Sequence, residues 1–353
     1  MKTSSVIAIS FVGATASLAA ADILEVPGEF PTIQAAIDAA VAGDEVLVSK
    51  GTYFEGIDFL GKDIVVRSVS GPLSTFINGT GLTTSVVRCM SGEPATARLE
   101  GFTIQHGITG TPLPLAPLIR VGGGIAVLNS SPTIEDCRFL HNASAYGGGA
   151  YIYLSDSIIR DCVFHQNQVS ADGGGAQTFG GNPTFQNCSF TYNKAVNSHG
   201  GGLHVAQGSA TLIDCVISNN TANIGGGLTY YPTGGSATLN GCEIKNNIGD
   251  VAGGFWVRPG FDDLVLVDTE VCGNAPSPYV GAYVDGGKNV FCEGCPGDLN
   301  NNGVVEGADV SVMLGFWGFS GVGIPVAADL NNDGVVEGAD LVVLLAAWGN
   351  CKP

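Results

Sequence analysis

The chain has 353 residues and a formal net charge of −18, with 14 Lys and Arg against 32 Asp and Glu. Such an acidic chain lacks the basic surface that binds nucleic acids or anionic membranes, which excludes both as partners. Glycine is abundant, with 53 residues, but it has no three-residue period, which excludes collagen. A hydrophobic content of 45% excludes a disordered chain, so the composition predicts a turn-rich, repetitive β structure.

Residues 1–21 have the features of a secretory signal peptide. Lys2 supplies a positive start, an apolar stretch runs from Val6 to Val12, and Ala19 to Ala21 offer a small-residue cleavage site. The segment is too short and too rich in Ser, Thr and Gly to span a bilayer, and no later stretch reaches about 18 apolar residues. We therefore expect a secreted protein, extracellular or at the cell surface, without a membrane span.

The first elements after this segment are a short helix and several strands. Thr32 to Ala40 have helical composition, and we expect an amphipathic helix that covers the open end of a repeat stack. Glu45–Val48, Asp63–Arg67 and Leu99–Ile104 have the apolar alternation of strands. The Pro-rich stretch from Thr111 to Pro117 interrupts this pattern and is expected to be an exposed loop.

An internal repeat of about 26 residues fills the middle of the chain. It is marked by three parallel columns of residues. Triple glycines begin at Gly122, Gly147, Gly173, Gly200 and Gly225, followed by a degenerate Ala252-Gly253-Gly254. Cysteines recur at Cys137, Cys162, Cys188, Cys215 and Cys242, with Thr269 at the next place. Five residues further on stand Asn142, Asn167, Asn193, Asn220, Asn247 and Asn274.

These columns predict coils that stack at about 4.8 Å along one axis. The Cys and the apolar residue two places later share one face because strand side chains alternate, and that face must be the interior. The residue before each Cys, such as Asp136 or Asp161, suits an outward face. Each Asn should hydrogen-bond to the Asn of the next coil, and the glycines should form tight corners where φ is positive. We expect the three-faced solenoid to run from about Asp44 to Phe291.

Two groups of motifs resemble a known superfamily. The segment from Pro31 to Tyr53, with Thr32-Ile33-Gln34-Ala35-Ala36-Ile37, resembles the N-terminal cap of the pectate-lyase-like right-handed β-helix proteins. The Gly-Gly-Gly and Asp-Cys-x-Phe-x-x-Asn repeats resemble its repetitive secreted members. The resemblance covers roughly residues 22–291 and implies an all-β, right-handed parallel β-helix solenoid. It implies activity only weakly, since the superfamily includes lyases, hydrolases, esterases, adhesins and proteins without an assigned role.

The C-terminus carries a second repeat, offset by 31 residues. Its two loops place oxygen side chains at positions one, three, five, nine and twelve, with Gly at six and a backbone carbonyl at seven, as in an EF-hand calcium loop. We therefore expect two Ca²⁺ ions. Their ligands would be Asp298, Asn300, Asn302, Val304, Glu306 and Asp309 in the first loop, and Asp329, Asn331, Asp333, Val335, Glu337 and Asp340 in the second.

The position-twelve Asp and the duplicated loop-helix unit without an entering helix resemble the type I dockerin module. This resemblance implies a small α-helical, EF-hand-type domain at 295–353, after a β-helix at 22–294, and a cohesin-like protein as partner. The chain departs from dockerins at positions ten and eleven. It has Gly307-Ala308 and Gly338-Ala339 where strongly docking modules carry polar or hydroxyl residues, which puts binding to a standard cohesin in doubt.

The chain has 10 cysteines. The interior column is expected to hold buried free thiols that pack as small apolar side chains, with a metal chain inside the coil as the alternative. Cys295 and Cys351 bracket the C-terminal module and are expected to close it as a disulfide. Cys272 and Cys292 lie near the last coil as a further candidate pair, and Cys89 has no evident partner.

Catalytic candidates are weak in this sequence. Asp136 and Asp161, with Arg138, are predicted neighbours on the outer face and could raise a pKa or hold a cation, or could simply solvate an exposed strand face. Ser198-His199-Gly200 reads as part of a repeat corner, so His199 is interpreted as a loop residue. A sugar platform could form from aromatic residues near the corners, which otherwise pack as ordinary β residues: Tyr146, Tyr151, Tyr230, Tyr231 and Trp256.

Two functional hypotheses remain. The first is a non-catalytic β-helix scaffold that binds glycan or a protein partner and is anchored through the calcium-dependent module. The second is a polysaccharide lyase or glycoside hydrolase, which the fold resemblance and the dockerin-like module suggest. The scaffold is favoured because no charged cluster breaks the regular repeat, and catalytic sites usually break local rules.

Overall fold

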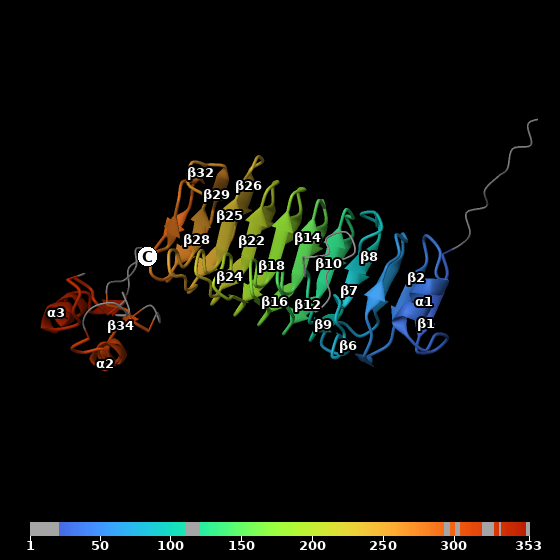
Figure 1. The fold of residues 1–353 in the computed structure, drawn as a ribbon, viewed down its shortest axis with the longest axis horizontal. Coiled ribbons are helices and arrows are strands. Elements are labelled where there is room, and N and C mark those ends of the chain that lie inside the picture. The colour runs from blue at the N-terminus through green and yellow to red at the C-terminus, as the bar shows by residue number, and fades with distance from the viewer. Residues whose placement is uncertain are drawn as a thin grey trace, which may run out of the picture.

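The computed structural model describes residues 21–109, 121–292, 297–300, 304–319, 328–331 and 333–350. Its main body is a stack of coils, each of which contributes a strand to three parallel sheets, here called A, B and C (Figure 1). The signal-peptide segment 1–20, the Pro-rich loop, Asn302, Cys295 and Cys351 lie outside the described residues. Within the described part of the chain, no helix is long and apolar enough to cross a membrane.

The strands of each sheet follow one another in chain order along the stack. Sheet A consists of β1 (Ile23–Val26), β2 (Glu45–Val48), β5 (Val65–Ser68), β8 (Arg98–Glu100), β11 (Thr133–Glu135), β15 (Ile158–Arg160), β19 (Thr184–Gln186), β23 (Thr211–Ile213), β26 (Ala237–Asn240), β29 (Leu264–Val267) and β32 (Val284–Asp285). Sheet B consists of β3 (Gly51–Tyr53), β6 (Thr75–Asn78), β9 (Thr103–Gln105), β12 (Arg138–Leu140), β16 (Val163–His165), β20 (Ser189–Thr191), β24 (Val216–Ser218), β27 (Glu243–Lys245), β30 (Glu270–Cys272) and β33 (Val290–Phe291).

Sheet C carries the face that matters most below. It consists of β4 (Ile57–Asp58), β7 (Val87–Cys89), β10 (Ile125–Leu128), β14 (Ala150–Tyr153), β18 (Ala176–Phe179), β22 (Leu203–Ala206), β25 (Leu228–Tyr231), β28 (Phe255–Val257) and β31 (Tyr279–Val280). A small sheet between B and C consists of β13 (Ala143–Ser144), β17 (Gln168–Val169) and β21 (Lys194–Ala195). The stack thus begins at β1, one coil earlier than the expected start near Asp44.

The asparagine column forms the predicted ladder inside the stack. Asn193 is typical: its Nδ2 donates to Asn220 Oδ1 at 3.0 Å and to the Phe164 carbonyl at 2.8 Å. Its own Oδ1 accepts from the backbone and side-chain amides of Asn167, both at 3.0 Å. These asparagines are buried, and buried polar groups need hydrogen-bond partners. From Asn142 to Asn274, neighbouring coils are therefore joined through side chains as well as through the sheets.

The cysteine column is inward and buried, as predicted, and its thiols are free. They also do more than fill space. Each Sγ donates to the carbonyl two residues earlier, for example Cys188 to Gln186 at 3.3 Å and Cys215 to Ile213 at 3.3 Å. Thr269 makes the same contact with its hydroxyl, to the Val267 carbonyl at 3.0 Å. The position therefore selects a small side chain that can donate a hydrogen bond.

The helix α1 (Ile33–Ala39) covers the first coils, as expected, with its apolar side chains in the core. Both of its ends are satisfied by side chains from the solenoid. The Glu55 carboxylate accepts from the backbone amides of Ile33 and Gln34 at 2.9 Å. Lys62 Nζ donates to the carbonyls of Ile37, Asp38 and Ala40 at 2.7–2.8 Å. These contacts fit the helix macrodipole, which favours an acid at the first end and a base at the last.

The C-terminal segment has a small core of its own. Helices α2 (Gly307–Gly315) and α3 (Gly338–Ala346) bury Met313 and Leu344 together with Val305 and Val336. A short antiparallel pair joins β34 (Val304–Val305) to β35 (Gly349–Asn350).

Candidate functional site

The acidic pair Asp136 and Asp161 does not lie on a strand face. Each residue stands at the corner between sheets A and B with a positive φ, 46° and 55°, and the cysteine that follows begins the turn inward. The same column holds Gly101, Asn187, Asp214, Gly241 and Asp268, all with positive φ. Asp, Asn and Gly are the residues that tolerate this left-handed conformation best. The corner therefore accounts for these residue types without any catalytic role.

The surroundings of this corner are polar and largely compensated. An open hollow there is lined by Glu135, Arg160, Asp161, Gln186, Asn187 and Asp214. The Arg160 guanidinium pairs with Glu135 at 2.7 Å, and Asn187 Nδ2 donates to Asp161 Oδ1 at 2.6 Å. Partial burial, and then the nearby charge of Asp161, raise the pKa of Asp136. Arg138, the third candidate, begins β12 on the outer side of sheet B.

The outer face of sheet C is organised differently. Inward residues such as Ile125, Val127 and Ile152 belong to the main core, whereas Ala126, Leu128 and Tyr151 belong to a separate cluster on the other side of the sheet. Two outward rows result from the in-register pairing of the strands. The first row is Asp58, Arg88, Ala126, Tyr151, Gln177, His204, Thr229 and Trp256. The second row is Leu128, Tyr153, Phe179, Ala206 and Tyr231.

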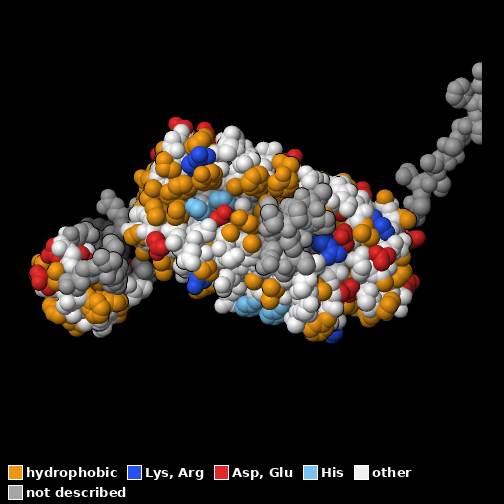
Figure 2. All heavy atoms as spheres, viewed as in Figure 1, with side chains coloured by type: hydrophobic (Ala, Val, Ile, Leu, Met, Phe, Trp, Pro, Cys, Tyr) orange, Lys and Arg blue, Asp and Glu red, His pale blue; other side chains and the backbone are white. Residues whose placement is uncertain are grey.

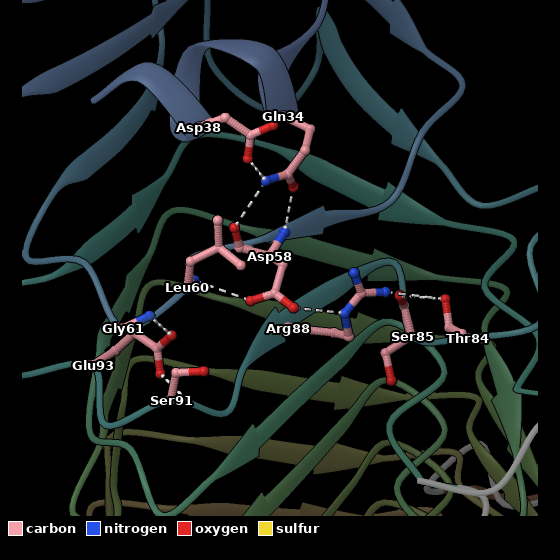
Figure 3. Close-up of polar contacts among 10 residues, drawn as sticks. All are labelled: Gln34, Asp38, Asp58, Leu60, Gly61, Thr84, Ser85, Arg88, Ser91 and Glu93. Atoms are coloured by element: carbon pink, nitrogen blue, oxygen red, sulfur yellow. Dashed lines mark hydrogen bonds and ion pairs between the residues drawn. The ribbon is translucent and has the colours of Figure 1, made fainter. Parts of the chain in front are cut away.

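The middle of the first row, from Ala126 to Thr229, is buried beside the triple-glycine corners. A Cβ at Gly173, whose φ is +74°, would lie 2.7 Å from the Gln177 Cβ, so only glycine allows this close approach. At the N-terminal end of the row, Arg88 Nε forms an ion pair with Asp58 Oδ2 at 3.0 Å. The backbone amide of Asp58 donates to Gln34 Oε1 (Figure 3).

Aromatic rings dominate the outer face of sheet C on both sides of its centre. Tyr153 stacks on Phe179 with ring centroids 5.6 Å apart, and both rings are partly exposed. Further along, Tyr231 stacks on Trp256 at 6.1 Å, and the Arg258 guanidinium lies 4.4 Å from the centroid of the Tyr231 ring. Figure 2 shows hydrophobic patches on this side of the molecule, with histidine and acidic side chains between them.

The interruption is a group of polar residues that we call the polar notch: Asp172, Gln177, Ser198, His199 and His204. Asp172 Oδ1 accepts from Ser198 Oγ at 2.5 Å and lies 3.0 Å from His199 Nδ1. The His199 ring lies between those of His204 and Trp256, with centroid distances of 5.9 and 6.1 Å. The geometry thus fixes two imidazoles beside an aromatic ring.

Electrostatics sets the charge states in the polar notch. Burial opposes ionisation of Asp172, but hydrogen bonds from His199 and Ser198 outweigh it and hold the pKa of this carboxyl well below its usual range. Burial lowers the pKa of His204 to about 4, against the opposing pull of the Asp172 charge. At neutral pH the notch therefore contains an ionised Asp172 and a neutral His204.

The sequence analysis interpreted His199 as a loop residue and did not single out Asp172, Gln177 or His204. The signal was present in the repeat register. Asp172 and His199 both directly precede a triple glycine, and Gln177 and His204 both stand four residues after its first glycine. Of the proposed aromatic platform, Tyr231 and Trp256 lie on the outer face of sheet C, whereas Tyr230 is fully buried in the core.

In the second predicted loop, the polar side chains bind amide groups of the loop itself. Asp329 accepts from the amides of Asp333 and Gly334 at 3.1 and 2.9 Å, and Asn331 Oδ1 accepts from Asp333 N at 2.9 Å. Gly334, at position six, has a φ of +89°. The position-twelve Asp340 is buried and accepts from the amides of Asn331 and Glu337. Oxygen-rich side chains turned into a loop suit a hard cation such as Ca²⁺.

The first loop is similar where it is described. Asp309 Oδ1 accepts from the amides of Leu299 and Asn300 at 2.8 and 3.0 Å, and its Oδ2 accepts from Glu306 N at 2.9 Å. Within the described ranges, three His, Cys, Asp or Glu side chains converge only at Glu270, Cys272 and Cys292. There the two sulfurs form a disulfide, which ties β30 to the end of β33.

Comparison with known proteins agrees with the fold. A family model described as right handed beta helix region matches residues 95–269. This chain is a right-handed parallel β-helix. No curated protein sequence matches it significantly.

Similar solved structures include two pectin methylesterases and a phage protein. The enzyme from carrot has a TM-score of 0.42 and 13% identity, over 78% of this chain and 89% of that chain. The enzyme from Aspergillus niger has a TM-score of 0.44 and 12% identity, over 77% and 87%. Tailspike gp49 of Acinetobacter baumannii bacteriophage Fri1, a capsular polysaccharide depolymerase, has a TM-score of 0.36 and 11% identity, over 77% and 62%. This likeness is limited to general shape, and no activity is transferred from it.

Proposed function

We propose that this protein is a secreted glycan-binding scaffold that holds an extended polysaccharide along the outer face of sheet C. The observation that carries the proposal is the pairing of Tyr153 with Phe179 and of Tyr231 with Trp256 on either side of the polar notch. Aromatic rings provide flat apolar area for the C–H faces of sugars, and polar groups placed between them fix orientation. Strands about 4.8 Å apart give a regular surface for a linear chain.

The ligand we propose is an uncharged polysaccharide. The whole chain carries a net charge of −18, which repels polyanions at long range. On the outer face of sheet C, Arg88 is paired with Asp58, and Arg258 lies over the Tyr231 ring. The ionised Asp172 would further oppose an anionic sugar beside the notch.

The alternative function, a polysaccharide lyase or glycoside hydrolase, is linked to Asp136, Asp161 and Arg138. We favour the scaffold because the left-handed corner already accounts for both acids. Incubation of the full chain with uronate-rich polysaccharides, with and without calcium, tests the alternative. Product formation that is lost in the Asp136→Ala/Asp161→Ala variant would establish an enzyme in place of a scaffold.

The C-terminal segment supports a second proposal, a dockerin-like module that binds two Ca²⁺ ions. The proposal is favoured by the side chains of Asp329 and Asn331, which are turned toward the loop and accept from its Asp333 amide, and by the positive φ of Gly334. When bound, each ion would neutralise its loop and fix the start of the following helix. Anchoring through a cohesin-like protein is the further role proposed for this module.

Affinity electrophoresis of the full chain tests the glycan proposal. Gels would contain xylan, glucomannan or β-glucan as neutral polysaccharides, and polygalacturonate or alginate as anionic ones. We expect retardation by at least one neutral polysaccharide and none by the anionic ones at low salt. Retardation by the anionic polysaccharides alone would contradict the proposed ligand class, and retardation by none would contradict the function.

A further inference from the structure

Two rows of the β-helix become polar at the same coils. Directly before the triple glycines the residues are Val121, Tyr146, Asp172, His199, Ile224 and Val251. From β10 to β28, the first outer row of sheet C is Ala126, Tyr151, Gln177, His204, Thr229 and Trp256. In both rows polar residues replace apolar ones around β18 and β22. A coincident break in two independent rows indicates a site, because packing alone would favour the apolar residues of the flanking coils.

Gln177 is the least satisfied member of the polar notch. Its side chain is 4% exposed, and its Oε1 has no hydrogen-bond partner in the structure. A buried acceptor left unpaired destabilises the folded state, so a ligand that donates to it recovers free energy. A hydroxyl group is such a donor, and it can also accept from a second group at the same time.

His204 stands beside Gln177 on the next strand and is oriented by Thr229. Its Nδ1 lies 2.5 Å from Thr229 Oγ1, and its side chain is 5% exposed. This contact fixes the ring and leaves Nε2 without a hydrogen-bond partner among the described residues. His199 is fixed in the same way through Asp172 and Ser198. The notch thus combines an unpaired amide oxygen with two positioned imidazoles.

Aromatic rings flank the polar notch on both sides along the stack. Phe179 stands two residues after Gln177 in β18, so both side chains are on the same face. The ring centroids of Trp256 and His199 are 6.1 Å apart. The Phe179 and Trp256 rings lie on strands three apart in sheet C, about 14 Å at the usual strand spacing, so an extended polysaccharide could stack different sugar residues on them. The sugar residue between them would present its hydroxyl groups toward the notch. Such an arrangement discriminates between sugars by hydroxyl position, because a missing hydroxyl leaves buried polar groups unpaired.

We propose that the polar notch is the specificity-determining subsite of this face, where Gln177 and His204 bind the hydroxyl groups of one neutral sugar residue. Asp172 acts as a positioning residue that holds His199 at the edge of this subsite. The inference rests on the proposed glycan binding. It adds that the protein recognises one sugar residue of the polysaccharide by its hydroxyl groups, through Gln177 and His204.

The test compares Gln177→Met with a matched control, Gln186→Met. Met has nearly the shape of Gln but cannot accept from a hydroxyl, and Gln186 is an exposed glutamine at the end of β19 in sheet A. Because the change at 177 removes an unpaired buried oxygen, we expect its melting temperature to equal or exceed that of the natural protein. If Gln177 had only a structural role, its replacement would instead lower the melting temperature. Gln177→Leu provides a second variant for the same comparison.

Dissociation constants would be measured by affinity electrophoresis in xylan, glucomannan, galactan and β-glucan, which differ in hydroxyl orientation. We expect Gln177→Met to weaken the tightest interaction by at least tenfold and to level the ranking among the four, with Gln186→Met unchanged. An unchanged affinity and ranking in Gln177→Met would overturn the subsite and leave glycan binding intact. If the natural protein binds none of the four, the proposed function fails and the subsite fails with it.

Discussion

His199 Nδ1 lies 3.0 Å from Asp172 Oδ1, although the two residues belong to different coils. Ser198 donates to the same oxygen, so a single carboxylate holds both a hydroxyl and an imidazole at the corner beside β22. The contact exists because the coils stack in register, which places residues about 26 positions apart side by side. In this fold a polar site is therefore assembled from equivalent positions of neighbouring repeats.

The asparagine ladder should be the most sensitive part of the stack. Asn193→Ala removes two donated and two accepted hydrogen bonds and leaves the backbone amide of Asn167 buried without its partner. We expect a loss of about 3 kcal/mol or more, seen as a lowered melting temperature by circular dichroism. Asn182→Ala, on an exposed turn, is the control and should change stability by no more than about 0.5 kcal/mol. Equal effects of the two changes would show that the ladder does not hold the coils together.

The cysteine column should accept a hydroxyl better than an apolar group of the same shape. Cys188→Thr preserves the donated bond to the Gln186 carbonyl, as Thr269 does naturally at its own coil. Cys188→Val removes the bond, and we expect it to be less stable than Cys188→Thr by about 1 kcal/mol. Thermal unfolding of both variants under reducing conditions measures the difference. A more stable valine variant would mean that the thiols serve only to fill volume.

Asp136 gives a prediction about pH. Burial and the neighbouring Asp161 raise the pKa of Asp136, so the folded state disfavours its ionised form. The contribution of Asp136 to folding stability is fully present below its pKa in the unfolded chain and is lost as pH rises through its pKa in the folded chain. Asp136→Asn should thus raise the melting temperature at pH 7 and leave it unchanged near pH 3, while Asn still tolerates the corner, as Asn187 does. The idea fails if the gain at pH 7 is absent, or if it persists undiminished in acid.

The proposed calcium loops imply two bound ions per chain. Isothermal titration of the full chain should show two sites, and Asp298→Ala and Asp329→Ala should each remove one, because position one supplies a direct ligand. Asp262→Ala, an exposed acid in the solenoid, is the matched control and should retain both. No heat of binding at millimolar calcium would exclude the dockerin-like module.

The sequence predicted the stack well because three columns repeat in one register, and the inward Cys and paired Asn residues are confirmed. Asp136 and Asp161 are exposed neighbours, as predicted, but they stand at a corner with positive φ and not on a strand, which strand alternation does not reveal. The sequence-based prediction also passed over Asp172 and His204. Asp172 and His204 lie close together because the glycine corners bring the chain near β18 and β22. A pattern of apolar residues in the sequence does not reveal such an approach.

Binding of a neutral polysaccharide on the outer face of sheet C is tested most directly by removing its rings. Tyr231→Ala/Trp256→Ala eliminates the stacked pair, whereas Tyr192→Ala removes a ring that is 56% exposed beside sheet B. Affinity for the polysaccharide that the natural protein binds best should fall at least tenfold in the double variant, about 1.4 kcal/mol, with the melting temperature nearly unchanged. Tyr192→Ala should bind like the natural protein. A double variant that binds as tightly as the natural protein would contradict the account.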